Sequence, residues 1–378
     1  MQPPYEVAGV LNAHWYDVQQ SAKFNTWQLR TLHAVRRCRT VALGAHVDGC
    51  TSCGHLRISY NSCRNRHCPK CQGNQREKWI QARQQELLPV PYFHVVFTLP
   101  NALNLICMHK PAVMYNILFQ TAWSVINSFG NDAKWMGAQS GMIAILHTWG
   151  QTLSLHPHLH CIVPGGGLTK QGKWKTAKTN GKYLFSVKAM SKVFRGRFIA
   201  LLKERLPEEM HPGFVNELYK NKWVVFAKRP FNGPQSVIEY LGRYTHKIAI
   251  SNHRIKNISD GRVTFSYRDY RAAAIIKEMS LDAREFIRRF AMHILPKGFV
   301  RIRHYGMVSS TSKAACAVVI KEQLPQMAEV KNYTKEIYNP LQCPCCKKET
   351  MQTILRFNRR GPPPQWQQMA KNILECLV

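Results

Sequence analysis

The chain has 378 residues, 45% of them hydrophobic, which is enough for two or three domains with a sizeable core and argues against a disordered chain. It carries 53 Lys and Arg against 21 Asp and Glu, a formal charge of +32. Such an excess favours a polyanionic partner such as nucleic acid, because each phosphate contact by Lys or Arg releases counterions. A basic enzyme without such a partner is the alternative.

No apolar run is long enough to cross a membrane and the first residues show no signal-peptide pattern, so we expect a cytoplasmic protein.

The first domain is predicted over residues 1–88 and begins with a helix. Residues 22–38 carry apolar side chains at helical spacing and predict a basic amphipathic helix. Residues 39–72 are rich in Cys, Gly, Asn and Ser, which predicts a small loop-rich unit without a core of its own. Residues 74–88 predict a helix that leaves this unit, and Pro89 marks the boundary.

A second domain is predicted over residues 89–310, where strand-like and helix-like segments alternate. Short apolar β-prone runs predict strands, and longer segments of helical periodicity predict helices. We expect strands at 92–99, 141–149, 158–163, 222–228, 247–251 and 262–267, helices at 111–128, 187–205, 234–246 and 281–294, and a turn at Gly165–Gly167. This order, with its hairpins, predicts a sheet covered by helices.

The remaining residues, 311–378, predict a basic C-terminal region. Cys343 and Cys346 form a Cys-x-x-Cys pair, with Cys345 between them. No second pair follows, so a metal-binding knuckle has only weak support here. The tail from Arg359 is rich in Pro and Gln and predicts a flexible, peripheral linker.

Cysteine usage predicts zinc near the N-terminus. The chain has 13 cysteines, and in a reducing compartment closely spaced pairs favour metal binding over disulfides. Cys50-x-x-Cys53 and Cys68-x-x-Cys71 lie within one short stretch. Two thiolate pairs at this spacing predict one tetrahedral four-sulfur zinc site.

Other side chains near these cysteines leave several readings open. Cys63 and His67 could replace a cysteine ligand or hold a second metal, although we favour a free thiol and a surface imidazole. Four basic residues surround the predicted site and are candidate DNA contacts: Arg57, Arg64, Arg66 and Lys70. The zinc site could contact DNA, hold the fold together, or do both.

A histidine pair predicts a second kind of metal site. His158 and His160 point to the same face of the predicted strand and form a bidentate metal clamp. His156 has the same parity and is a further candidate ligand. Pro157 disfavours a fully paired central strand, so we expect the strand to begin after it or to run at a sheet edge.

Two tyrosines supply candidate nucleophiles. Tyr240 and Tyr244 lie one helical turn apart, although two core tyrosines would show the same spacing. Arg243, His246 and Lys247 lie beside them and could hold a phosphate or lower a phenol pKa. A tyrosine hydroxyl can attack a phosphodiester when a metal polarises the phosphoryl oxygen, and the product is a covalent phosphotyrosine.

Together these features resemble the rolling-circle, two-tyrosine HUH transposases of the "IS ninety-one" insertion-sequence group. The similar strings are HTWGQTLSLHPHLHCIVPGGG (147–167), YLGRYTHKIAISNHRI (240–255), FSYRDYR (265–271) and EFIRRFAMHILPKGFVRIRHYG (285–306). They occur in the family's order, and the resemblance extends from about residue 5 to about residue 360.

The resemblance implies an α+β, HUH endonuclease-like fold with an antiparallel-rich sheet flanked by helices and an N-terminal zinc ribbon. It implies that His158 and His160 bind Mg²⁺ or Mn²⁺ and that Tyr240 and Tyr244 act as alternating nucleophiles on single-stranded element ends and target DNA in the nucleoid. The family has a third metal ligand, for which three residues are candidates here: His156, Glu239 and His246. No P-loop or helicase is visible, so host replication factors would separate the strands.

Two alternatives remain open at this point. A rolling-circle replication initiator or relaxase would use the same metal and tyrosine chemistry in another process. A zinc-ribbon DNA-binding protein without catalysis would keep the two tyrosines in its core.

Overall fold

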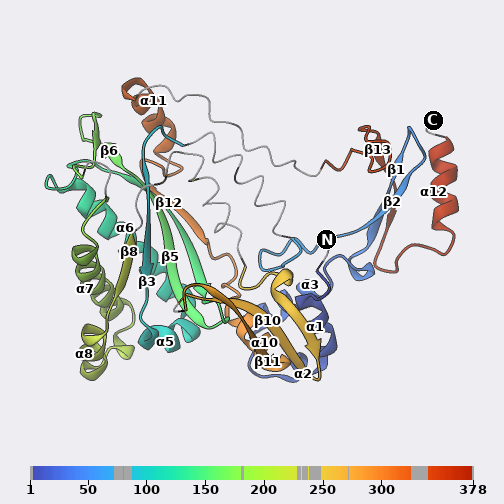
Figure 1. The fold of residues 1–378 in the computed structure, drawn as a ribbon, viewed down its shortest axis with the longest axis horizontal. Helices are drawn as coiled ribbons and strands as arrows, with labels where there is room; N and C mark the ends of the chain where they lie inside the picture. The colour runs from blue at the N-terminus through green and yellow to red at the C-terminus, as the bar shows by residue number, and fades with distance from the viewer. Residues whose placement is uncertain are drawn as a thin grey trace. The chain divides into compact units, whose positions relative to one another are not determined.

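The structure, a computed structural model, describes residues 3–71, 80, 87–179, 183–227, 231, 237, 248–270, 272–324 and 339–376 (Figure 1). It forms two compact units, each assembled from separated stretches of the chain. Unit 1 comprises Met1–Glu77, Ile248–Ile294 and Thr334–Val378, and unit 2 comprises Lys78–Lys247 and Leu295–Tyr333. This division differs from the predicted boundaries at 88 and 310. Two later stretches of the chain join the N-terminal residues, because they pair and pack with them rather than with their sequence neighbours.

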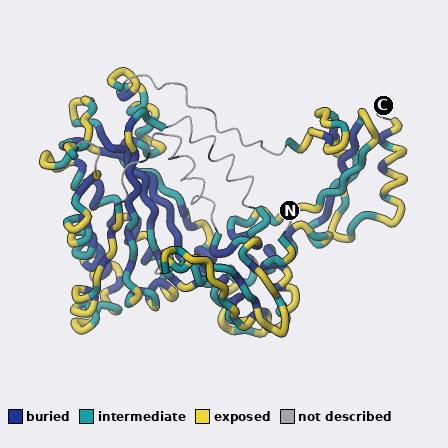
Figure 2. Tube along the Cα trace, in the orientation of Figure 1, coloured by how far each residue is buried: buried dark blue, intermediate teal, exposed yellow. Residues whose placement is uncertain are grey.

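Unit 2 is built around a five-stranded antiparallel sheet, in the order β12-β4-β5-β3-β8. The strands are β3 (Tyr92–Thr98), β4 (Gly141–Trp149), β5 (Leu155–Pro164), β8 (Val224–Ala227) and β12 (Ile302–Gly306). Almost all residues of the strands in the middle of this sheet are buried (Figure 2). The predicted α+β fold with an antiparallel-rich sheet is therefore confirmed.

Helices cover one face of this sheet, and their apolar sides form the main core. These helices are α5 (Asn104–His109), α6 (Pro111–Asn131), α7 (Val187–Arg205) and α8 (Pro212–Lys220). Side chains alternate along β3, so Phe93, Val95 and Phe97 point into this core, where Phe97 packs on Phe194 of α7. The intervening residues point to the opposite face, which carries the histidines described below.

Two predictions for β5 and the residues after it are wrong. β5 begins at Leu155, before Pro157, and is a central strand. The missing N–H of Pro157 is tolerated because it lies on the β3 side of the strand, just beyond the last β3 pair, Thr98↔His158, where the Pro157 carbonyl still accepts the Leu99 amide.

The glycines after β5 form no simple turn. Gly166 and Gly167 begin β6 (Gly166–Leu168), which pairs with β7 (Trp174–Thr176). A Cβ at Gly167 would lie 2.3 Å from the Gln139 carbonyl oxygen, so glycine is needed here for close backbone approach. The last helix of this unit is α11 (Lys313–Gln323).

Unit 1 contains a small helical core. It is formed by α1 (Val7–Ala13), α2 (Trp15–Gln20), α3 (Thr26–Arg36) and α10 (Ala283–Met292), with a sheet of β9 (Ile255–Ser259), β10 (Arg262–Asp269) and β11 (Ile275–Asp282). Asn25 caps α3 in a capping box with Gln28, and Asp282 caps α10 through the Arg284 amide. The strand predicted at 247–251 is absent from its described residues, 248–251.

A second sheet in unit 1 joins the two ends of the chain. Its order is β13-β1-β2, with β1 (Ala45–Cys50), β2 (Leu56–Tyr60) and β13 (Met351–Phe357). The tail predicted to be a flexible linker carries a helix, α12 (Trp366–Glu375), because Ala370 and Leu374 find a buried apolar site. Among the described residues, no helix is long and apolar enough to span a membrane.

Candidate active site and metal centres

Three histidines converge on the sheet face opposite the one that packs on α5, α6, α7 and α8. His158 and His160 are two residues apart on β5 and therefore share one face. The register of β4 with β5 places His147 directly opposite His158, on that same face. One ring nitrogen from each of the three lies within 4.8 Å of the others, so the group can hold a metal ion.

The spacing and burial of these rings suit metal binding. The Nε2 atoms of His158 and His160 are 3.1 Å apart, close to the about 3 Å that separates adjacent ligands in an octahedral site. His147 is 2% exposed and His160 is 8% exposed, whereas His158 is half-buried. His158 is therefore the most accessible of the three rings.

Hydrogen bonds to the other ring nitrogens orient two of these rings. His158 Nδ1 donates to the backbone carbonyl of His156 at 2.6 Å, which leaves Nε2 free of its proton. His160 Nδ1 lies 2.9 Å from Nε2 of His94, a buried β3 residue whose ring stacks on that of His160. Partners of this kind fix the tautomer and direction of metal-binding histidines.

The sequence identified two of the three cluster members, and missed His147 and the supporting residue His94. His156 is absent from the ligand group; it supplies its carbonyl, and burial lowers the pKa of its side chain. His147 takes the third position, which was assigned to other candidates. The strand prediction for 141–149 contained the signal, because a hairpin partner of β5 must place one residue opposite His158. His94 gave no recognisable sequence signal.

Both predicted nucleophiles, Tyr240 and Tyr244, lie outside the described residues. So do Arg243, Lys247 and the two other candidate ligands, Glu239 and His246, and most of the predicted helices at 74–88 and 234–246. One residue of the second segment, Val237, is described. It is fully buried in a cluster with Ile145 and Ile162, which point from the same sheet face as the histidines.

The first cysteine cluster consists of Cys38, Cys63, Cys68 and Cys71. Sγ of Cys71 lies 3.5 Å from that of Cys38 and 3.7 Å from that of Cys63. Four sulfurs at 2.3 Å from a tetrahedral zinc are about 3.8 Å apart, so this geometry suits one structural zinc. Hydrogen bonding among the four thiols lowers the pKa of Cys71 and raises the pKa of Cys63 and Cys68, so the site needs a cation to hold all four as thiolates.

The prediction that Cys50, Cys53, Cys68 and Cys71 form one site is wrong. Cys50 and Cys53 belong to a second cluster with Cys343 and Cys346. The two Cys-x-x-Cys pairs do not share a site, because Cys50 is the last residue of β1 whereas Cys68 and Cys71 follow β2 in the chain. Cys63 is a cluster member rather than a free thiol, and His67 is a buried residue outside both clusters rather than a surface imidazole.

The predicted DNA-contacting residues differ in their availability. Arg57 pairs with Asp48 at 3.0 Å and Lys70 with Glu6 at 2.5 Å, while burial lowers the pKa of Arg66. Arg64 is exposed. The surface around the first cluster is thus less open to a phosphate than the sequence alone indicates.

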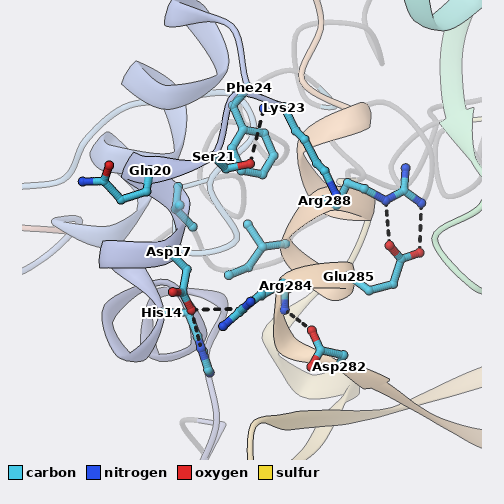
Figure 3. A pocket seen from close by; sticks show the side chains of 12 residues that line it. His14, Asp17, Gln20, Ser21, Lys23, Phe24, Asp282, Arg284, Glu285 and Arg288 are labelled. Atoms are coloured by element: carbon cyan, nitrogen blue, oxygen red, sulfur yellow. Dashed lines mark hydrogen bonds and ion pairs between the residues drawn. The ribbon is translucent and has the colours of Figure 1, made fainter.

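A cavity of about 500 Å³ in unit 1 contains none of these residues (Figure 3). It lies between α2 and α10, and two ion pairs line it, Arg284 with Asp17 and Arg288 with Glu285. The first pair links α10 to α2, and the second lies within α10.

Two families of known proteins match the chain. The family described as "Putative transposase" matches residues 141–315, and the one described as "Transposase zinc-binding domain" matches residues 10–99. The first range contains the three-histidine cluster, and the second contains the first cysteine cluster. No solved structure is significantly similar to the chain.

Two curated relatives extend the match over most of the chain. It is 41% identical over 377 aligned residues to "Putative transposase y4qJ" of Sinorhizobium fredii, which covers 92% of this chain and 94% of that protein. It is 28% identical over 326 residues to "Transposase for insertion sequence element IS801" of Pseudomonas savastanoi pv. phaseolicola, covering 79% and 74%. The chain therefore belongs to the insertion-sequence transposases of the IS ninety-one family and carries their zinc-binding domain.

Proposed function

We propose that this transposase cuts and rejoins single-stranded DNA at the ends of its insertion sequence, through a 5′-phosphotyrosine intermediate, in rolling-circle transposition. The observation that supports it best is the cluster of His147, His158 and His160 on the sheet face opposite helices α5, α6, α7 and α8. Val237, three residues before Tyr240, packs on that same face. The names of both relatives, one of them an insertion-element transposase, support the same process.

The histidine cluster suits a divalent cation. His147, His158 and His160 would hold the ion through one imidazole nitrogen each, and nitrogen donors favour Mn²⁺ over Mg²⁺. Such an ion would polarise a phosphoryl oxygen and so make the phosphorus more electrophilic. The protein's own part is to hold His158 and His160 in fixed tautomers through the His156 carbonyl and His94.

We assign the nucleophilic step to Tyr240 and Tyr244. The phenolic oxygen of one tyrosine attacks the phosphorus, a P–O bond to tyrosine forms, and the P–O3′ bond breaks. The phenol loses its proton, and the leaving 3′ oxygen takes one up to give the free 3′-OH that primes replication. The second tyrosine handles the other end or the target, and attack by a 3′-OH on the phosphotyrosine rejoins the strand.

The partner is DNA, which the formal charge of +32 favours. The zinc-binding domain, with the first cysteine cluster holding one zinc, recognises the element end, and the protein works on the nucleoid. Host replication factors supply the strand separation. A plasmid-type initiator or relaxase would share the chemistry but would act at a replication origin.

The test is adduct formation on a single-stranded oligonucleotide that carries an element end. With Mn²⁺ present, the protein should form a denaturation-resistant adduct, and Tyr240→Phe/Tyr244→Phe should lose the adduct but keep binding. A matched oligonucleotide with a plasmid origin should not react. An adduct that survives the double substitution excludes these nucleophiles, and binding without any adduct indicates a non-catalytic DNA-binding protein.

A further inference from the structure

The C-terminal strand is an integral part of the N-terminal zinc-binding sheet. β13 pairs with β1 from Ala45↔Phe357 to Cys50↔Met351 and lies along the edge of β1 that β2 leaves open (Figure 1). Asp48, a largely buried β1 residue, accepts hydrogen bonds from Thr353 Oγ1 at 2.8 Å and from Arg57 at 3.0 Å. The pairing thus includes a buried polar link as well as the backbone ladder.

Two matching turns lie at the end of this sheet. In the first, the Gly54 amide donates to the Cys50 carbonyl at 3.0 Å, and the Cys50 amide donates to the His55 carbonyl at 2.9 Å. In the second, the Lys347 amide donates to the Cys343 carbonyl at 3.0 Å.

The second turn repeats the first in two further respects. The Cys343 amide donates to the Lys348 carbonyl at 2.8 Å, as the Cys50 amide does to His55. The residue after each second cysteine has left-handed backbone, with φ of +71° at Gly54 and 64° at Lys347. A lysine adopts this left-handed conformation at a cost in free energy. Other interactions of the turn around Cys343 and Cys346 must therefore offset that cost.

The four thiols of these turns meet at metal-binding distances. Sγ of Cys50 lies 3.6 Å from that of Cys346, and Sγ of Cys53 lies 3.7 Å from that of Cys343. All four sulfurs lie within 4.8 Å of one another, against the about 3.8 Å of a tetrahedral four-sulfur zinc site. Cys50 and Cys343 are fully buried together with Met351, and the Thr350 hydroxyl lies 3.1 Å from Cys50 Sγ.

We propose that Cys50, Cys53, Cys343 and Cys346 bind a second structural zinc, which fastens the C-terminal segment to the N-terminal zinc-binding domain. The matched zinc-binding family ends at residue 99 and so does not include half of these ligands. The domain that the proposed function assigns to end recognition is then built from both ends of the chain.

This zinc closes an exceptionally long loop. The ligand pairs are separated by 296 and 290 residues along the chain. Because loop-closure entropy rises with loop length, a metal that closes a long loop stabilises the folded state more than one that closes a short loop. The proposal therefore makes the stability of β1, in the N-terminal part, depend on cysteines near the other end.

The first test counts zinc released by a mercurial thiol reagent, which displaces zinc from cysteine ligands but not from histidines. The wild-type chain should release two zinc ions, and Cys343→Ser/Cys346→Ser should release one. Cys345→Ser is the matched control, because Cys345 lies in the same turn, is exposed and is outside the cluster, and it should release two. Release of one zinc by the wild type, or of two by the double variant, overturns the proposal.

A second test needs no substitution. Thiol alkylation with peptide mapping during slow chelation should label Cys50, Cys53, Cys343 and Cys346 in one kinetic phase, while the exposed Cys345 and Cys376 react from the start. Labelling of Cys346 at the rate of Cys345 before chelation refutes the site. Neither readout involves DNA cleavage, so the second zinc and the tyrosine chemistry can fail independently.

Discussion

His94 offers the sharpest test of how the histidine cluster is positioned. Its Nε2 lies 2.9 Å from His160 Nδ1, and the two rings stack with centroids 5.1 Å apart. His94→Phe keeps an aromatic ring that can stack on His160 but removes the hydrogen bond. Loss of such a partner typically weakens metal binding or activity by about 10–100-fold, equivalent to about 1.4–2.8 kcal/mol.

The assay is adduct formation on a single-stranded element end, measured across a range of Mn²⁺ concentrations. We expect His94→Phe to raise the Mn²⁺ midpoint about 10–100-fold and to recover at saturating metal. His94→Gln, whose amide can still bond His160 Nδ1, should fall between the variant and the wild type. His109→Gln, at an exposed histidine of α5, is the matched control and should change nothing.

Two results would refute this reasoning. An unchanged midpoint in His94→Phe, with thermal unfolding also unchanged, would mean that His94 only fills space in the core. A loss of activity that saturating Mn²⁺ does not restore would mean that His94 acts other than through the metal ligands.

Three further predictions concern the ligand set and the two units. His147→Ala should weaken Mn²⁺ binding more than His156→Ala, because only His147 belongs to the ligand cluster, and equal effects in a calorimetric titration would contradict this. Arg288 chiefly, with Arg289, lowers the pKa of Glu285 to about 2 (Figure 3). Glu285→Gln should therefore destabilise the protein at neutral pH. Because the depressed pKa stabilises only above the unfolded carboxyl's pKa of about 4.3, the difference from wild type should shrink as pH falls from about 5 towards 2 in urea unfolding; a constant difference would argue against the pairing. Gly306→Ala should lower the melting temperature more than Gly298→Ala, because both have left-handed backbone but only Gly306 would place a Cβ 2.2 Å from the Ser140 carbonyl oxygen. The strain common to both is about 1–2 kcal/mol, and equal losses would mean that the backbone moves aside.

Local periodicity was sufficient to predict the positions of most strands of the five-stranded sheet and of its helices. α7 has the predicted bounds, and β3 and β4 lie where apolar β-prone runs predicted strands. Side-chain alternation on one strand was likewise sufficient to place His158 and His160 on one face. Pairing between distant segments could not be predicted in this way: the register that brings His147 opposite His158, and the pairing of β13 with β1.

The cysteine clusters, too, could be predicted only in part from local sequence patterns. Spacing identified each Cys-x-x-Cys pair, because two ligands in one turn are a local property. Which pairs share a metal depends on where the strands end, and Cys38 and Cys63 complete the first cluster without any paired spacing of their own. Sequence proximity therefore grouped Cys50 and Cys53 with Cys68 and Cys71, whereas their partners lie beyond residue 340.

The central claim is that Tyr240 or Tyr244 becomes joined to a DNA 5′-phosphate. Trypsin separates the two tyrosines, since cleavage after Arg243 leaves Tyr240 on the preceding peptide and Tyr244 on the next. Mass spectrometry of the nuclease-trimmed, trypsin-digested adduct should find the nucleotide on one or both of these peptides. A nucleotide on any other peptide, with both of these unmodified, would contradict the account.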